Sequence, residues 1–68
     1  MPRYYVNNQS QDNGDHEVHV LGCYWLKLAT STLDLGDHST CRTAVATAKK
    51  VYSTANGCAT CSPDCHTS

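Results

Sequence analysis

The chain has few of the large apolar side chains from which a small domain builds its core. Among its 68 residues there is no phenylalanine, one tryptophan, and one methionine, which is the first residue. A chain of this length buries only about 60% of the surface of its unfolded state, and its core alone rarely supplies more than a few kcal/mol. Small scaffolds add disulfides, a metal ion or oligomerisation to such a core. We therefore expect something other than apolar burial to hold the domain together.

Basic residues are also scarce. Five Lys and Arg stand against six Asp and Glu, for a net charge of −1, and the basic residues do not cluster beyond Lys49 and Lys50. A nucleic-acid-binding protein normally carries a basic stripe, because phosphate contacts dominate its affinity. The charge therefore favours a protein partner over a nucleic acid, which stays a weaker alternative.

Long apolar runs are missing as well. The first 15 residues contain no apolar segment of the signal-peptide type, and no run approaches the roughly 20 residues that cross a bilayer. We expect a cytoplasmic protein without a membrane segment. In a reducing compartment, clustered cysteines bind metal or take part in catalysis more often than they form disulfides. The cysteine count is five, so no pairing within one chain uses them all.

The N-terminal half reads as short strands. Tyr and Val favour a strand over residues 3–7, and alternation predicts another over 16–20, after an Asn13-Gly14 turn. On that second strand His16 and His19 face opposite sides of the sheet. Residues 32–35 alternate and predict a third strand. The sequence therefore predicts one domain over residues 1–68, of the α+β class, with a three-stranded antiparallel β-meander.

One helix is expected to pack on this meander. Apolar side chains recur at helical spacing between Cys41 and Tyr52, and Asn56-Gly57 can end the helix, which we place at about 39–54. Cys41 lies on the apolar stripe and is expected to pack in the core. We expect the ordered core to cover about 3–61 and a cysteine-rich tail to follow over 62–68.

The strongest chemical signal is Cys58-x-x-Cys61, because two thiolates at this spacing can bind the same tetrahedral Zn²⁺. Redox sites share the motif, but they place it in a βαβ context that this chain lacks. His19-x-x-x-Cys23 is the best candidate for the second pair, since it lies where a strand ends and the chain turns at Gly22. The four residues together form a Cys₃His set of the closed structural type.

Two other interpretations compete with this set. Cys65 and His66 could replace or join the first set of ligands, which gives a local knuckle with Cys58 and Cys61. Each member of the first pair also has an ordinary role open to it, His19 as a solvent-facing strand histidine and Cys23 as a small buried hydrophobe. The chain has no Ser-His-Asp arrangement and no phosphate loop, so an enzyme is not favoured.

The order of these features resembles the small Ada-like zinc modules, which include the metal-binding domain of bacterial alkylation-repair proteins. The matching order is YYV, H-x-x-x-C, LxLG, C-x-x-A, a helix and a final GC-x-x-C, over roughly residues 4–61. The residues that match are His19, Cys23, Ala44, Cys58 and Cys61. The chain also resembles short bacterial proteins that end in a cysteine-rich tail.

The resemblance implies a zinc-stapled α+β module. In the alkylation-repair domain, four cysteines hold the zinc and one of them accepts a methyl group from DNA. This chain has His19 in place of one cysteine and no basic DNA-binding face, so methyl transfer does not carry over. From the sequence we expect a structural-zinc domain that acts as a protein-interaction module. The alternatives are a reactive-thiol protein, in redox response or alkyl acceptance, and a weak nucleic-acid-binding module.

Overall fold

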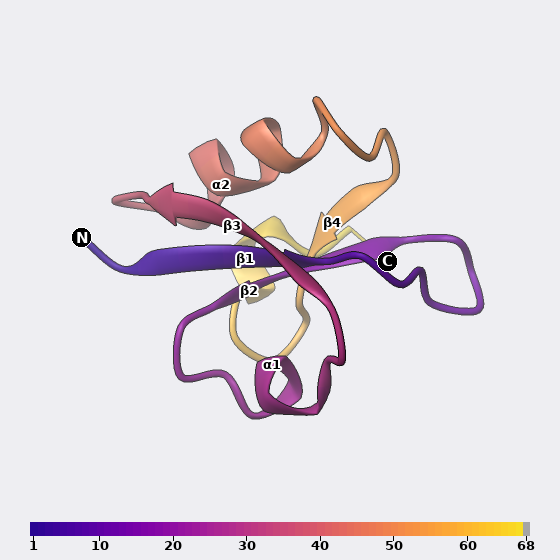
Figure 1. Ribbon diagram of the computed structural model, residues 1–68. Helices are drawn as coiled ribbons and strands as arrows, with labels where there is room; N and C mark the ends of the chain where they lie inside the picture. The colour runs from indigo at the N-terminus through magenta and orange to yellow at the C-terminus, as the bar shows by residue number, and fades with distance from the viewer. Residues whose placement is uncertain (68) are drawn as a thin grey trace.

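The computed structural model describes residues 1–67 and has the α+β fold class that the sequence predicts. In chain order the elements are β1 (Arg3–Asn7), β2 (His16–Val20), α1 (Tyr24–Leu28), β3 (Thr32–Asp37), α2 (Cys41–Ala48), β4 (Ala55–Gly57) and the 3-10 helix η1 (Pro63–Cys65). Helix α2 lies on one side of the sheet, and helix α1 lies on the other (Figure 1). Within residues 1–67, neither helix has the length and hydrophobicity needed to cross a membrane.

The sheet is mixed and has four strands in the order β3-β1-β2-β4. The antiparallel β1–β2 pair is the predicted hairpin, with Val6 opposite Val18. The predicted meander is not found, because β3 pairs with β1 rather than with β2. The chain leaves β2, passes through α1 and returns on the far side of β1. The free edge of β2 is taken by β4, which runs parallel to it with Val18 opposite Gly57.

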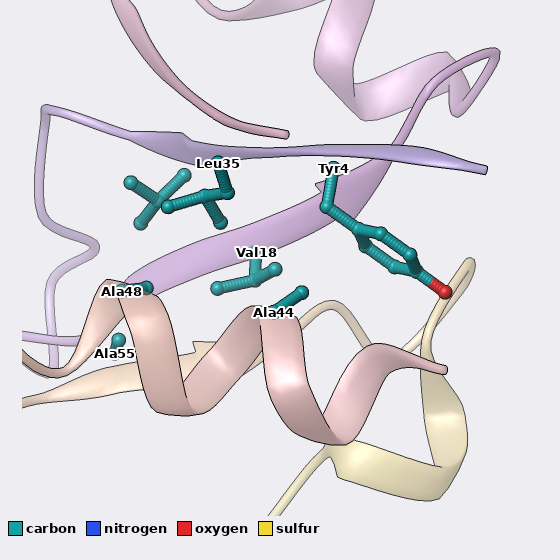
Figure 2. Packing of buried hydrophobic residues seen from close by; sticks show 7 residues of the cluster. Tyr4, Val18, Leu35, Ala44, Ala48 and Ala55 are labelled. Carbon is teal, nitrogen blue, oxygen red and sulfur yellow. The ribbon is translucent and has the colours of Figure 1, made fainter. Parts of the chain in front are cut away.

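The hydrophobic core occupies the face of the sheet that α2 covers (Figure 2). Alternation along the strands directs Val6 and Val18 to this face, and both are fully buried. The helix presents two small side chains, Ala44 and Ala48, at a spacing of four residues, and both are also fully buried. Small residues let the helix lie close to the sheet. His16 stacks on Tyr52, which packs against this core, whereas His19 points to the opposite face of the sheet. The prediction that the two histidines face opposite sides of the sheet is confirmed.

Helix α2 is shorter than predicted. It ends at Ala48, where the sequence predicts a helix to about residue 54, and the chain continues in turns to β4. The apolar periodicity runs on through Val51 and Tyr52, which extended the prediction. Tyr52 packs against the core from its turn, but Val51 is 58% exposed. The apolar periodicity therefore predicted the packing of Tyr52 correctly and that of Val51 wrongly. Neither residue lies in the helix.

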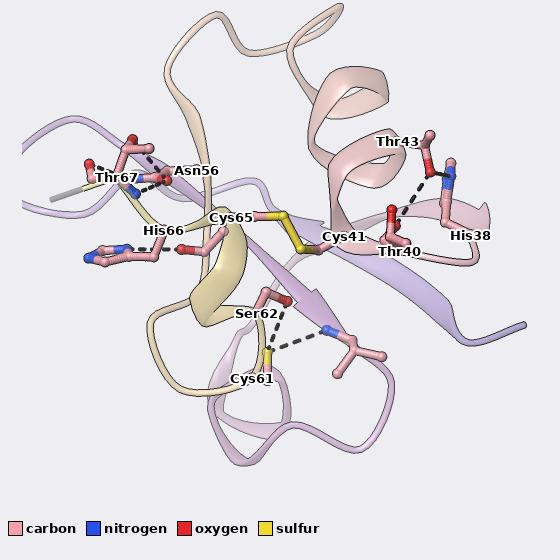
Figure 3. Close-up of a disulfide and its surroundings, with 12 residues drawn as sticks. His38, Thr40, Cys41, Thr43, Asn56, Cys61, Ser62, Cys65, His66 and Thr67 are labelled. Atoms are coloured by element: carbon pink, nitrogen blue, oxygen red, sulfur yellow. Dashed lines mark hydrogen bonds between the residues drawn. A yellow bond between two sulfur atoms is a disulfide. The ribbon is translucent and has the colours of Figure 1, made fainter.

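Cys41 is partly buried against the core, as predicted, and it also forms a disulfide with Cys65 that the sequence analysis did not predict. The bond joins the start of α2 to η1 across 24 residues of sequence (Figure 3). Packing also continues past residue 61: Thr67 donates its backbone N–H to the Asn56 side chain at 3.0 Å, and the Cys65 N–H is bonded to Ser62. Much of the segment that the sequence analysis set apart as a tail is thus fixed to the domain.

The packing of α2 is tested by enlarging one of its alanines. Ala44→Leu adds three carbons where no exposed surface remains, and overpacking of this kind costs typically about 1–3 kcal/mol. Ala46→Leu is the matched control, because Ala46 is exposed on the same helix. Urea unfolding of the two variants should give a clearly lower stability for Ala44→Leu alone. Equal stabilities would show that the buried face of the helix is assigned wrongly.

Candidate metal centre

Two segments far apart in sequence build the site beneath the sheet. The first is the end of β2, where Val20 and Cys23 close a turn through a 3.0 Å backbone hydrogen bond. Gly22 occupies the third position of this turn with φ of +97°, a conformation that glycine adopts without a steric penalty. The turn brings Cys23 back beneath the strand, on the face to which His19 points.

The second segment follows β4. Parallel pairing places Gly57 beside Val18, and the next backbone N–H, that of Cys58, donates to the Val18 carbonyl at 3.0 Å. The Cys58 carbonyl in turn accepts from the Ser62 N–H at 2.8 Å. This bond closes the C-x-x-C turn and directs Cys61 toward the end of β2. Cys58 and Cys61 therefore reach the site because β4 adds to the edge of β2.

The four predicted ligands come together. One ligand atom from each of His19, Cys23, Cys58 and Cys61 lies within 4.8 Å of all the others. The Nδ1 atom of His19 is 3.6 Å from the sulfur of Cys23 and 3.8 Å from that of Cys61. This donor set could bind a metal ion. Sequence spacing identified every member of the group.

The alternative ligands are used elsewhere. Cys65 is in the disulfide with Cys41, and the Nδ1 atom of His66 bonds to the Gly57 carbonyl at 3.0 Å (Figure 3). The backbone of Cys65 packs so tightly on Gly57 that an added Cβ at Gly57 would lie 2.7 Å from the Cβ of Cys65. The local knuckle therefore does not form. Cys65 and His66 instead contact Gly57, the last residue of β4, which directly precedes Cys58.

The group is closed to solvent on most sides. His19 and Cys58 are each 1% exposed and Cys23 is 6% exposed, whereas Cys61 is only partly buried. Helix α1 covers the site from outside, since Trp25 donates its indole N–H to Thr60, within the C-x-x-C turn, at 3.2 Å. A site with four protein ligands and this degree of burial leaves no position for a reacting water, which is the pattern of structural rather than catalytic metal sites.

The protonation of the group suits metal binding. Burial lowers the pKa of His19, so the imidazole is neutral near pH 7 and offers a lone pair. Burial, followed by the contact with Cys23, raises the pKa of Cys61 to about 12. For Cys23 the burial acts in the same direction, but the hydrogen bond from Cys61 and backbone N–H groups of α1 outweigh it and lower the pKa. Of the two thiols, Cys23 therefore loses its proton more readily than Cys61.

Metal binding would displace the protons of the cysteine thiols. Thiolates are the metal-binding form of cysteine, so binding releases protons and weakens as the pH falls. The sulfur of Cys61 already accepts the Val20 backbone N–H at 3.4 Å. A backbone donor of this kind stabilises negative charge on a bound thiolate and fixes its orientation.

Comparison of the chain with protein-family models, with curated proteins and with solved structures finds no match. The resemblance to Ada-like modules thus depends on the short motifs alone. The geometry of His19, Cys23, Cys58 and Cys61 supports a metal site on its own physical terms.

Proposed function

We propose that the chain is a structural-zinc domain that binds a protein partner. The observation that carries the zinc assignment is the buried group of one imidazole and three thiols drawn from two distant segments. Cys₃His is one of the recurring ligand sets of structural zinc, and soft thiolates disfavour Mg²⁺ and Ca²⁺. The absence of an open ligand position argues against a hydrolytic metal centre.

The spacing of the ligand atoms supports a tetrahedral ion. Zn–S bonds of about 2.3 Å and Zn–N bonds of about 2.0 Å give tetrahedral N···S separations of roughly 3.5 Å and S···S separations of roughly 3.8 Å. The two N···S separations here are 3.6 and 3.8 Å. Small adjustments of the cysteine side chains would complete the tetrahedron. No rearrangement of β2 or of the C-x-x-C turn is required.

The protein-binding part of the proposal comes from helix α1 and the turn before it. No residue of the helix is fully buried, and most of the segment's large apolar side chains are exposed, Leu26 being partly buried. Four of them, between 48% and 63% exposed, form what we call the α1 patch: Leu21, Tyr24, Trp25 and Leu28. So dense an apolar patch on a small domain is typical of a binding surface, and aromatic residues are the usual anchors of protein interfaces.

Zinc and the α1 patch are linked by the chain itself. Cys23 lies immediately before α1, and Trp25 is bonded to the C-x-x-C turn. A five-residue helix is too short to persist by itself in water. We infer that the metal holds this helix in place and so presents the patch. Lys27 is the only charged side chain of α1, which favours a protein over a nucleic acid as the partner.

Loss of a ligand should remove both the metal and the fold. Cys23→Ser and Cys61→Ser are each expected to lower the zinc content from one ion per chain to nearly none. Each variant should also leave a largely unfolded chain, because zinc binding by small domains is coupled to folding. Elemental analysis and far-ultraviolet circular dichroism, on protein purified without chelator, provide the two measurements.

The control for this experiment removes the other two cysteines. The double variant Cys41→Ser/Cys65→Ser loses the disulfide but no proposed ligand. It should retain one zinc ion and lose about 2–4 kcal/mol of stability. A double variant without zinc, together with a Cys23→Ser variant that keeps it, would move the metal site to the C-terminal segment.

Partner binding should depend on the α1 patch. Immobilised zinc-loaded protein is used to capture partners, and a captured protein is then purified and its affinity measured by calorimetry. Tyr24→Ser/Leu28→Ser should weaken this affinity by at least about tenfold, which corresponds to about 1.4 kcal/mol lost for the two interface residues together. Val51→Ser is the matched control, because Val51 is equally exposed but lies far along the chain. Equal losses in the two variants, with zinc retained in both, would contradict the assignment of the surface.

A further inference from the structure

One ligand of the candidate metal centre differs from the others in its access to solvent. Cys61 is partly exposed, whereas His19, Cys23 and Cys58 are at least nine-tenths buried. Cys61 also lies on the wall of a pocket of about 260 Å³ between β1, the start of α2 and η1. Of the four candidate ligands, Cys61 is therefore the one that small molecules can approach most readily.

Half of the residues that line the pocket carry a hydroxyl group: Tyr4, Ser39, Thr40 and Ser62. Such a lining suits small neutral polar molecules. The Tyr4 ring lies at one end of the core cluster, with its hydroxyl directed away from the other core residues (Figure 2). The carboxylate of Asp64 is on the same wall and repels anions, which include thiolates and hypochlorite. The volume is ample for hydrogen peroxide or a small organic hydroperoxide.

The immediate surroundings of the Cys61 sulfur suit oxidation. The Ser62 hydroxyl is 3.8 Å from this sulfur, and the Val20 backbone N–H is 3.4 Å from it (Figure 3). These groups can stabilise an oxygen added to the sulfur. A second thiolate to complete the reaction is within reach, because the sulfurs of Cys23 and Cys58 lie within 4.8 Å. Cys41, also on the pocket wall, is already in a disulfide and cannot compete as a nucleophile.

We propose that Cys61 is an oxidation site through which a hydroperoxide releases the metal ion. The Cys61 thiolate attacks the peroxide, forms an S–O bond and breaks the O–O bond, which yields Cys61 sulfenic acid and hydroxide. The thiolate of Cys23 or Cys58 then attacks the Cys61 sulfur and displaces the second hydroxide. Two thiolates lose two electrons in total, and one peroxide is reduced to two hydroxides. The ion keeps only two of its four ligands and dissociates.

This inference rests on the proposed zinc site and adds a chemical response to it. The two are tested separately, because the experiment begins only with full-length protein shown to contain one zinc ion per chain. Failure to load zinc would refute the site. Loaded protein that reacts elsewhere would refute only the role of Cys61.

The first experiment maps the oxidation. Zinc-loaded protein is treated with one equivalent of hydrogen peroxide, and zinc release is followed with a chromophoric indicator. Remaining thiols are then alkylated, and the disulfides are mapped by mass spectrometry. We expect release to coincide with a new disulfide that contains Cys61. A Cys23–Cys58 disulfide with Cys61 intact would overturn the proposal, as would release without any new disulfide. Cys58 is the relevant competitor, because it borders a second pocket of about 180 Å³ although it is 1% exposed.

The second experiment blocks the pocket without touching a ligand. Ser39→Trp places a bulky side chain on the pocket wall at an exposed position. It should slow peroxide-driven zinc release by about tenfold, because the oxidation of a thiolate follows its accessibility. Ser53→Trp is the matched control, on the wall of a different pocket. Equal rates for Ser39→Trp, Ser53→Trp and the unmodified chain would exclude this route of access.

Discussion

The structure depends on the junction between the end of β2 and the C-x-x-C turn. The parallel pairing of β2 with β4, and the hydrogen bond from the Cys58 N–H to the Val18 carbonyl, bring the two halves of the candidate metal centre together. His19 and Cys61, 42 residues apart in sequence, meet there at 3.8 Å. On the other face of the sheet the core is small and includes three alanines. A metal ion at this junction would supply the cohesion that the small core lacks.

One crosslink in the structure fixes the C-terminal segment, and a metal ion at the candidate centre would add a second. The disulfide between Cys41 and Cys65 ties η1 to the start of α2, and the close packing of Cys65 on Gly57 supports β4 just before Cys58. A metal ion at the candidate centre would tie the same C-terminal segment to β2 and to the turn before α1. The disulfide departs from the expectation that the clustered cysteines of a reducing compartment bind metal rather than pair with one another. It leaves the assignment of the metal ligands intact, because the disulfide uses neither pair.

The sequence predicted the candidate site better than it predicted the sheet. Cys58-x-x-Cys61 and His19-x-x-x-Cys23 are local patterns whose spacing already restricts where the side chains can point, and the structure brings all four together. Strand order has no such local signal. The pairing of β3 with β1 rather than with β2 depends on where the chain returns after α1. Strand β4 was not predicted because Ala55, Asn56 and Gly57 show no strand pattern. Cys41 packs against the core as predicted, but its disulfide was missed because a cysteine on an apolar stripe has the same sequence pattern with or without a disulfide partner.

The central claim is that one zinc ion is held by three cysteines and one histidine from these two segments. X-ray absorption at the zinc edge of the purified full-length protein tests it most directly, because the method counts ligand types around the ion. The account predicts about three sulfur ligands at about 2.3 Å and one nitrogen ligand at about 2.0–2.1 Å. A first shell of four sulfurs would show that His19 is not a ligand. A shell dominated by oxygen and nitrogen would contradict the site as a whole.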